Sequence, residues 1–197
     1  MYRIMVAARD MRRPRIGLTG SAGVGKTTLA LTVADALGVP VLEERMRARL
    51  LAGFSLHAMT RDEHRDLLRD DSEDLIDAAT ACDDGFVSDR TPLDFVAFWL
   101  CNGYAADEPD GTGALLERAI AATEAWDAVI VLPWGVLPLL DDGVRYPNRW
   151  HQLHAQTVIE GLCRRYVPMP RLHFMPAHMN EPDVRCDWIL RHVGVVP

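Results

Sequence analysis

The sequence predicts an α/β fold in which a parallel sheet is covered by helices on both faces. Short, continuous apolar runs alternate along the chain with longer segments whose apolar residues recur at helical spacing. Polar residues do not alternate within these runs, as they would in a strand with one solvent-facing side. A glycine-rich turn joins the first apolar run directly to the first helix. We therefore expect βα units and a three-layer domain.

The individual elements follow from these runs and from the residues that end them. The first run, RIGLTG, ends in glycine, and the helix after it stops at Gly38. A later helix begins with Thr91 as its cap and Pro92 in its first turn. The predicted strands are residues 15–20, 39–44, 86–90, 127–134 and 172–176. The predicted helices are residues 25–38, 45–53, 59–82, 91–104, 114–126 and 180–193, with a loop leading into a further helix over 141–166.

Two segments between these elements are less regular. Residues 106–113, ADEPDGTG, are rich in turn-forming residues, so they are expected to form a loop. The long helix over 59–82 is strongly acidic in its first half, and Asp71 is where a break would fall. Asn180 is the expected cap of the final helix.

Composition limits the class of protein. The chain has 197 residues, of which 49% are hydrophobic, enough for one domain with its own core. Its net charge of -7 disfavours nucleic acid and anionic membranes as partners. The four cysteines are far apart and indicate free thiols in a cytoplasmic protein. No apolar run is long enough to span a bilayer. We assign residues 1–14 to an N-terminal extension and 15–197 to the domain.

Lysine usage singles out one position. Lysine and arginine together number 21, and Lys26 is the only lysine in the sequence. The compact ammonium group of lysine and the wide planar guanidinium of arginine are not interchangeable in tight sites. The one position that keeps a lysine lies in the glycine-rich turn, which indicates that its chemistry requires an ammonium group there.

That turn matches a phosphate-binding loop. Residues 20–27 read GSAGVGKT, which fits the pattern G-x-x-x-x-G-K-[ST] between a predicted strand and a helix. Backbone N–H groups and the helix N-terminus would bind the phosphates of ATP, and Lys26 would reach the terminal ones. Thr27 would place its hydroxyl on Mg²⁺. The expected nucleotide contacts are Gly20, Ser21, Ala22, Gly23, Val24, Gly25, Lys26, Thr27 and Thr28.

Other sequence features narrow the class of P-loop protein. The apolar run VIVLPW lacks the Asp-Glu pair that ends the corresponding strand of motor ATPases, and neither N-K-x-D nor L-S-G-G-Q occurs. Instead, Asp89 and Arg90 follow the third predicted strand. The active site of such a sheet lies at the C-terminal ends of its strands, so Asp89 is placed beside the P-loop and can hold Mg²⁺.

Three segments extend this pattern. VPVLEERMRARL (39–50), FVSDRTPLDFVAF (86–98) and LPWGVLPLLDDGVR (132–145) resemble the NadR-like family of P-loop ATPases and kinases, which includes ribosylnicotinamide kinase. More distantly, they are similar to deoxynucleoside and thymidylate kinases. The resemblance covers about residues 15–193. It implies a three-layer P-loop NTPase fold with five parallel strands in the order 2-3-1-4-5 and a lid over about 141–166.

The resemblance also implies roles for individual residues. Glu44 matches a carboxylate that takes the proton from the attacking hydroxyl, although Glu43 and Asp89 remain alternative bases. Arg90 would face a phosphate or the acceptor, and Arg145 would arrive on the lid. The roles of three further residues stay open: Asp94 as a helix-end or substrate residue, Arg149 beside Arg145, and Trp134 as a stacking platform.

The function expected from this sequence is an ATP- and Mg²⁺-dependent kinase acting on a hydroxyl or phosphate of a small nucleoside-like metabolite. The alternative is an ATP-binding switch or regulator that acts on a protein partner. A kinase for a modified base in DNA is a third interpretation, which the negative charge disfavours. The acceptor, the choice between ATP and GTP, the true start methionine and a homodimer are left open.

Overall fold

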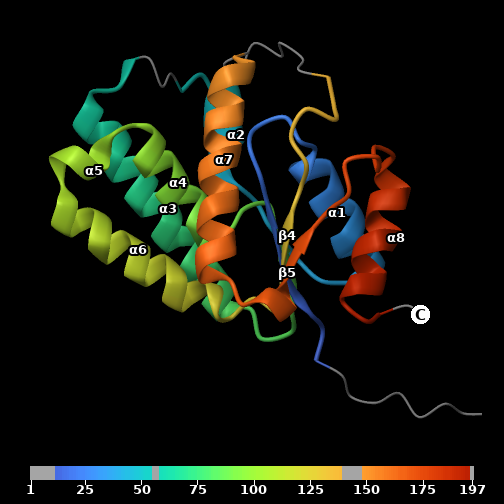
Figure 1. Ribbon diagram of the computed structural model, residues 1–197. Helices are drawn as coiled ribbons and strands as arrows, with labels where there is room; N and C mark the ends of the chain where they lie inside the picture. Colours follow the sequence, from blue (N-terminus) through green and yellow to red (C-terminus); the bar gives the residue numbers. More distant parts are fainter. Residues whose placement is uncertain (1–11, 55–57, 139–147, 196–197) are drawn as a thin grey trace, which may run out of the picture.

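The computed structural model describes residues 12–54, 58–138 and 148–195, and it confirms the expected sheet (Figure 1). Within these residues the sheet has five parallel strands in the order β2-β3-β1-β4-β5. The strands are β1 (Arg15–Thr19), β2 (Val41–Leu42), β3 (Phe86–Ser88), β4 (Ala128–Val131) and β5 (Leu172–Phe174). The first strand is therefore central, and its C-terminal end is flanked by the ends of β3 and β4.

Helices cover both faces of this sheet. On one side lie α1 (Lys26–Leu37) and α8 (Pro182–His192), which pack side by side (Figure 1). The helices on the other side are α3 (Arg61–Ala81), α4 (Pro92–Cys101), α5 (Tyr104–Asp107), α6 (Pro109–Thr123) and α7 (Arg149–Tyr166). The described residues also contain α2 (Arg45–Leu51), which follows β2, and the 3₁₀ helix η2 (Met169–Arg171), which precedes β5.

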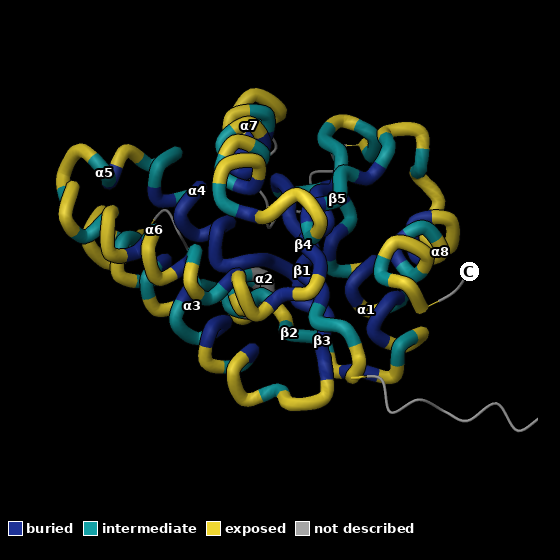
Figure 2. The backbone as a smooth tube through the Cα atoms, turned by 60° about the horizontal axis from the view of Figure 1, so that its bottom comes forward, coloured by how far each residue is buried: buried dark blue, intermediate teal, exposed yellow. Residues whose placement is uncertain are grey.

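The three central strands, β1, β3 and β4, are buried on both faces, as their unbroken apolar runs predict, whereas the outer strands β2 and β5 are partly exposed. Ile16 and Leu18 of β1 point toward α1 and α8, with no exposed surface. Val129 and Val131 of β4 belong to the core on the opposite face, beneath α4 and α7. Figure 2 shows this central layer as buried tube between exposed helical surfaces. Because the P-loop directly follows β1, it lies at the C-terminal edge of this buried parallel sheet.

The predicted loop over 106–113 is wrong, because most of it is helical. Residues 104–107 form α5, and α6 begins at Pro109 and runs through Gly111 and Gly113. Proline is favourable in the first turn of a helix, where its missing N–H removes no helical hydrogen bond. Leu115 and Ala119 of α6 are buried against α4. This packing outweighs the poor helix propensity of the glycines.

The helix over residues 61–81 is continuous, so no break falls at Asp71. Asp71 is buried on α3 and forms an ion pair with Arg49 of α2 at 2.6 Å. A carboxylate that composition alone assigns to a solvated surface therefore joins two helices. The cap of the final helix is Glu181, followed by Pro182, one position later than predicted.

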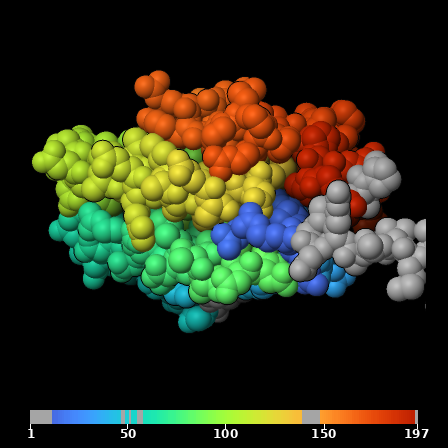
Figure 3. Space-filling model, turned by 90° about the horizontal axis from the view of Figure 1, so that it is seen from below, coloured from blue at the N-terminus to red at the C-terminus, as the bar shows by residue number. Residues whose placement is uncertain are grey.

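The N-terminal edge of the sheet is held by contacts near the start of the domain. The backbone N–H of Arg15 donates to Asp127, and Arg12 pairs with the same carboxylate. Figure 3 shows this edge, with the start of β1 in blue beside the end of α6 in yellow. Across the described ranges, no helix combines the length and apolarity that a membrane span requires. The functional groups gather at the opposite, C-terminal edge.

Candidate active site

The P-loop, residues 20–27, leaves β1 and enters α1 in the conformation that its glycines permit. Gly20, Gly23 and Gly25 all have positive φ angles, which glycine adopts without steric cost. The ammonium group of Lys26 donates to the carbonyl oxygens of Gly20 and Ser21, both at 2.8 Å. The loop thus folds back around the lysine.

The charge of Lys26 lies in a buried environment. Burial lowers the pKa of Lys26 from 10.5 to about 8, and the nearby positive charge of Arg90 acts in the same direction. The carboxylates of Asp89, Asp94 and Glu44 act in the opposite direction but do not restore the ordinary pKa. An anion bound at the loop would favour the protonated lysine.

Asp89 and Thr27 meet at the expected metal position. The hydroxyl of Thr27 donates to Asp89 Oδ2 at 2.5 Å, so strand β3 and helix α1 bring the two side chains together. Burial raises the pKa of Asp89, although Lys26, Thr27 and Arg90 lower it in part. The second carboxylate oxygen, Oδ1, is buried and has no hydrogen-bond partner among the described residues. A hard cation with oxygen ligands fits this pair of groups.

Arg90 is held between two carboxylates. Its Nε lies 2.9 Å from Glu44 Oε1, and its Nη1 lies 3.3 Å from Asp94 Oδ1. Burial alone would lower the pKa of Arg90, but Glu44 and Asp94 outweigh it, so the pKa is raised and the guanidinium stays charged. The ring of Phe98 packs against the guanidinium at 4.7 Å. The orientation of Arg90 is therefore fixed.

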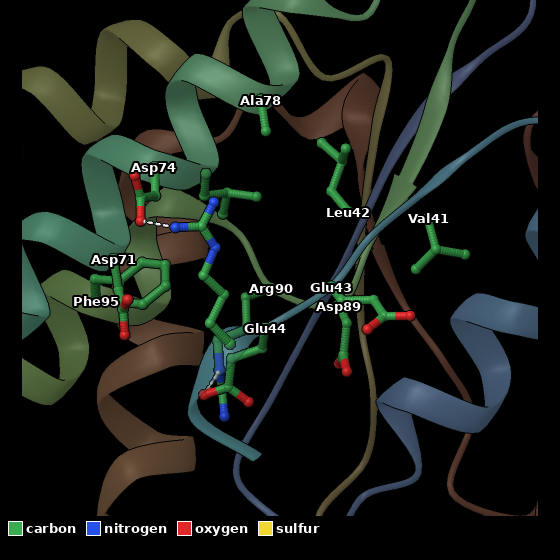
Figure 4. Close-up of a pocket in the computed structure, with 12 residues that line it drawn as sticks. Val41, Leu42, Glu43, Glu44, Asp71, Asp74, Ala78, Asp89, Arg90 and Phe95 are labelled. Atoms are coloured by element: carbon green, nitrogen blue, oxygen red, sulfur yellow. Dashed lines mark hydrogen bonds and ion pairs between the residues drawn. The ribbon is translucent and has the colours of Figure 1, made fainter. Parts of the chain in front are cut away.

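The two adjacent glutamates diverge. Glu44 is largely buried and turns toward Arg90, whereas Glu43 is exposed and its carboxylate points away (Figure 4). This difference follows from the alternation of side chains along an extended segment. Of the two, Glu44 is the one that the structure joins to Arg90.

Asp94 is a buried carboxylate that connects α4, the end of β1 and Arg90. Its Oδ2 accepts hydrogen bonds from the backbone N–H and hydroxyl of Thr91 and from the hydroxyl of Thr19, each at 2.8 Å. The side chain has no exposed surface. Asp94 thus caps α4, ties it to the end of β1 and holds Arg90. Its contacts correspond to the helix-end role rather than to a substrate contact.

A cavity of about 420 Å³ opens beside these groups (Figure 4). Its lining contains five carboxylates, from α3 and from the residues that directly follow β2 and β3. Both arginines that line it, Arg45 and Arg90, are already paired with carboxylates. The acidic residues of its wall are Glu43, Glu44, Asp71, Asp74 and Asp89.

A second cavity, of about 260 Å³, lies against the other side of the P-loop. Trp134 and Arg149 both line it, and the Arg149 guanidinium lies 5.3 Å from the centre of the Trp134 ring. The predicted lid covers about residues 141–166; its first part, residues 141–147 with Arg145, lies outside the described residues, and the rest is mainly helix α7. His151 and His154 lie three residues apart on α7, a spacing that could bind a metal, but within the described ranges no group of three or more His, Cys, Asp or Glu side chains is placed to hold one.

Gln156 is a residue that sequence reasoning missed. Its Oε1 accepts from the backbone N–H of Ser21 at 2.8 Å, and its Nε2 donates to Leu132 O at 3.0 Å. The side chain is 2% exposed. It therefore joins the first turn of the P-loop to the end of β4. The only sequence signal is a glutamine on the helix face that also carries Ile159.

Comparison with known protein families and structures identifies the family of this chain. A model of the AAA domain matches residues 15–171, about four fifths of the chain. The chain belongs to the AAA domain family. Comparison with curated protein sequences gives no match.

Solved structures share the fold of this AAA domain at low sequence identity. Deoxyadenosine kinase from M. mycoides, with dCMP and dCDP bound, has a TM-score of 0.60 at 14% identity, over 92% of this chain and 100% of that chain. Thymidylate kinase from Candida albicans has a TM-score of 0.60 at 12% identity, over 91% of this chain and 90% of that chain. NadR protein in complex with NR has a TM-score of 0.61 at 16% identity, over 94% of this chain but only 53% of the NadR chain. The chain thus has the fold of P-loop small-molecule kinases.

Proposed function

We propose that this AAA domain is an ATP- and Mg²⁺-dependent kinase that phosphorylates a hydroxyl group of a small, nucleoside-like acceptor. The observation that carries the proposal is the acidic cavity, which brings Glu44, Asp89 and Arg90 to the side of a P-loop. A P-loop protein that only senses nucleotide has no need for a cavity lined by carboxylates beside the P-loop. The kinase fold of the similar structures supports the same interpretation.

The nucleotide half of the site follows from the P-loop. Backbone N–H groups of residues 20–28 would surround the phosphates, as at other helix N-termini. Lys26, freed from the carbonyls of Gly20 and Ser21, would bind the terminal phosphates. Thr27 and Asp89 would hold Mg²⁺, which fits the unpartnered Asp89 Oδ1. When bound, Mg²⁺ would neutralise phosphate charge during transfer.

In the acceptor half of the site, we assign the role of general base to Glu44. Asp89 is engaged by Thr27 and by the proposed metal, and Glu43 points away from Arg90. Glu44 would accept the hydroxyl proton as the oxygen attacks the γ-phosphorus, and the bond to the β–γ bridging oxygen would break to release ADP. Arg90, fixed by two carboxylates, would lie beside the reacting groups and stabilise their charge.

The charge of the cavity supports a hydroxyl acceptor rather than a phosphate acceptor. Five carboxylates line it, and arginines pair with three of them, Glu44, Asp71 and Asp74, so the lining keeps a net negative charge. A phosphomonoester would be repelled there, because clamps for phosphates are built from unpaired arginine and lysine. Uncharged or positively charged acceptors are favoured instead. A volume of about 420 Å³ is within the range of small-molecule sites.

The test is acceptor-dependent formation of ADP from MgATP. The panel would contain nucleosides, nucleoside monophosphates and ribosylated vitamins, with products identified by mass. We expect an uncharged or cationic nucleoside to gain one phosphate, and the product to disappear in Lys26→Ala and Glu44→Gln. Turnover of a monophosphate alone would refute the hydroxyl assignment. Tight MgATP binding without stimulation by any acceptor would favour the nucleotide switch.

A further inference from the structure

Arg185 reaches the P-loop from helix α8. Its Nη1 donates to the carbonyl oxygen of Val24, and its Nε donates to that of Met179, both at 2.8 Å. The guanidinium also packs behind Gly25, since a Cβ built on that glycine would lie 3.2 Å from Nη1. The residue is 2% exposed. A buried arginine therefore lies directly against the outer side of the phosphate-binding turn, one residue before Lys26.

The charge of Arg185 is not balanced by any carboxylate among the described residues. Both of its hydrogen bonds go to neutral carbonyls, and its Nη2 is buried without a partner. Burial lowers the pKa of Arg185, and no acidic group opposes this effect. Arg90, the other buried arginine near the loop, has two carboxylates. A buried charge without a counter-ion is unfavourable, so the location of Arg185 requires a reason.

We propose that Arg185 is a positioning residue of the nucleotide site and that the bound triphosphate supplies its counter-charge across the P-loop. The arginine would fix the turn at Val24 and add a positive potential behind the backbone N–H groups that face the phosphates. The protein would carry the cost of the buried charge without nucleotide and recover it on binding. This inference rests only on the nucleotide half of the proposed function.

The two roles that Arg185 could have predict different results for Arg185→Met. If its charge serves the triphosphate, the folded variant binds MgATP at least about tenfold more weakly, which is ~1.4 kcal/mol. Its free energy of unfolding without nucleotide should then stay the same or rise, because an unpaired buried charge has been removed. If Arg185 only holds α8 to the loop, the unliganded variant is less stable and binds MgATP with unchanged affinity.

Arg185→Lys separates charge from shape. Lysine keeps the positive charge but cannot donate to both carbonyls in the arginine geometry. We expect it to restore most of the affinity that Arg185→Met loses. Equal losses in the two variants would overturn the proposal, and so would a change below twofold in Arg185→Met. Affinities would be measured by titration calorimetry and stabilities by urea unfolding.

A matched control is available in Arg171→Met. Arg171 also donates to two carbonyls, those of Glu124 and Trp126, but it is the last residue of η2, just before β5 and away from the P-loop. The affinity of the Arg171→Met variant for MgATP should equal that of the unaltered chain. If the unaltered chain binds no MgATP, the kinase proposal and this inference both fail. If it binds MgATP but phosphorylates no acceptor, only the kinase proposal fails, and the affinities still decide the role of Arg185.

Discussion

Replacing Asp94 by alanine should destabilise the protein severely, although Asp94 faces no substrate cavity. The carboxylate accepts three hydrogen bonds, from Thr19 and Thr91, and it pairs with Arg90. Loss of a helix cap costs about 1 kcal/mol. Breaking a buried ion pair costs about 3–5 kcal/mol. Because Arg90 keeps Glu44 as a partner, the lower end applies to the pair, and we expect a total loss of about 4 kcal/mol.

Urea unfolding followed by tryptophan fluorescence would measure this loss as a shift in midpoint at constant slope. Asp110→Ala is the matched control, since Asp110 also lies in the first turn of a helix but is exposed. Its expected cost is below about 1 kcal/mol. A loss below about 1 kcal/mol for Asp94→Ala would refute the reasoning, because it would mean that the four contacts contribute nothing net.

Three further predictions concern the reaction, the nucleotide and the stability of the P-loop. Glu44→Gln should lower kcat by about 10²–10⁴-fold without changing MgATP affinity, because it removes the general base. The control Glu43→Gln should change kcat less than about threefold. Equal losses of kcat for the two variants in a steady-state assay would show that Glu44 is not the base. MgATP affinity should be highest below about pH 8 and weaken above it, because the protonated Lys26 with its pKa of about 8 is the form that binds phosphate. Calorimetry from pH 7 to 9.5 tests this, and a flat profile would contradict it. Gln156→Leu should lower the free energy of unfolding of the nucleotide-free protein by about 1–3 kcal/mol, because it leaves the Ser21 N–H of the P-loop buried without an acceptor. Urea unfolding tests this, and unchanged stability would show that the loop holds its shape without Gln156.

The nucleotide side of the site could be predicted because it is local in sequence. Residues 20–27 form one continuous pattern, and its strand–turn–helix context is visible in the adjacent residues. Asp89 follows from the rule that sites lie at the C-terminal ends of parallel strands. The strand order was implied by the family resemblance, and the pairing of the strands confirms it.

The supporting residues could not be predicted, because packing between distant segments creates them. Gln156 meets Ser21 across 135 positions, and Arg185 meets Val24 across 161. Nothing in the neighbourhood of either residue marks it as functional. The same holds for α6. The composition of its first residues favours a loop, but burial of Leu115 against α4 stabilises a helix. Local propensity is a weak guide wherever a tertiary contact opposes it.

The solitary lysine has a practical consequence for spectroscopy. Because Lys26 is the only lysine, the chain carries a single ε-amino group, and that group lies in the P-loop. Reductive methylation with ¹³C-formaldehyde would therefore introduce one side-chain resonance, apart from that of the N-terminal amine. Its chemical shift would follow the protonation of the dimethylated amine in the P-loop, which keeps one N–H where the unmodified ammonium donates to two carbonyls. Each nucleotide or acceptor added to the sample would then be read at the nitrogen that is proposed to bind the terminal phosphates.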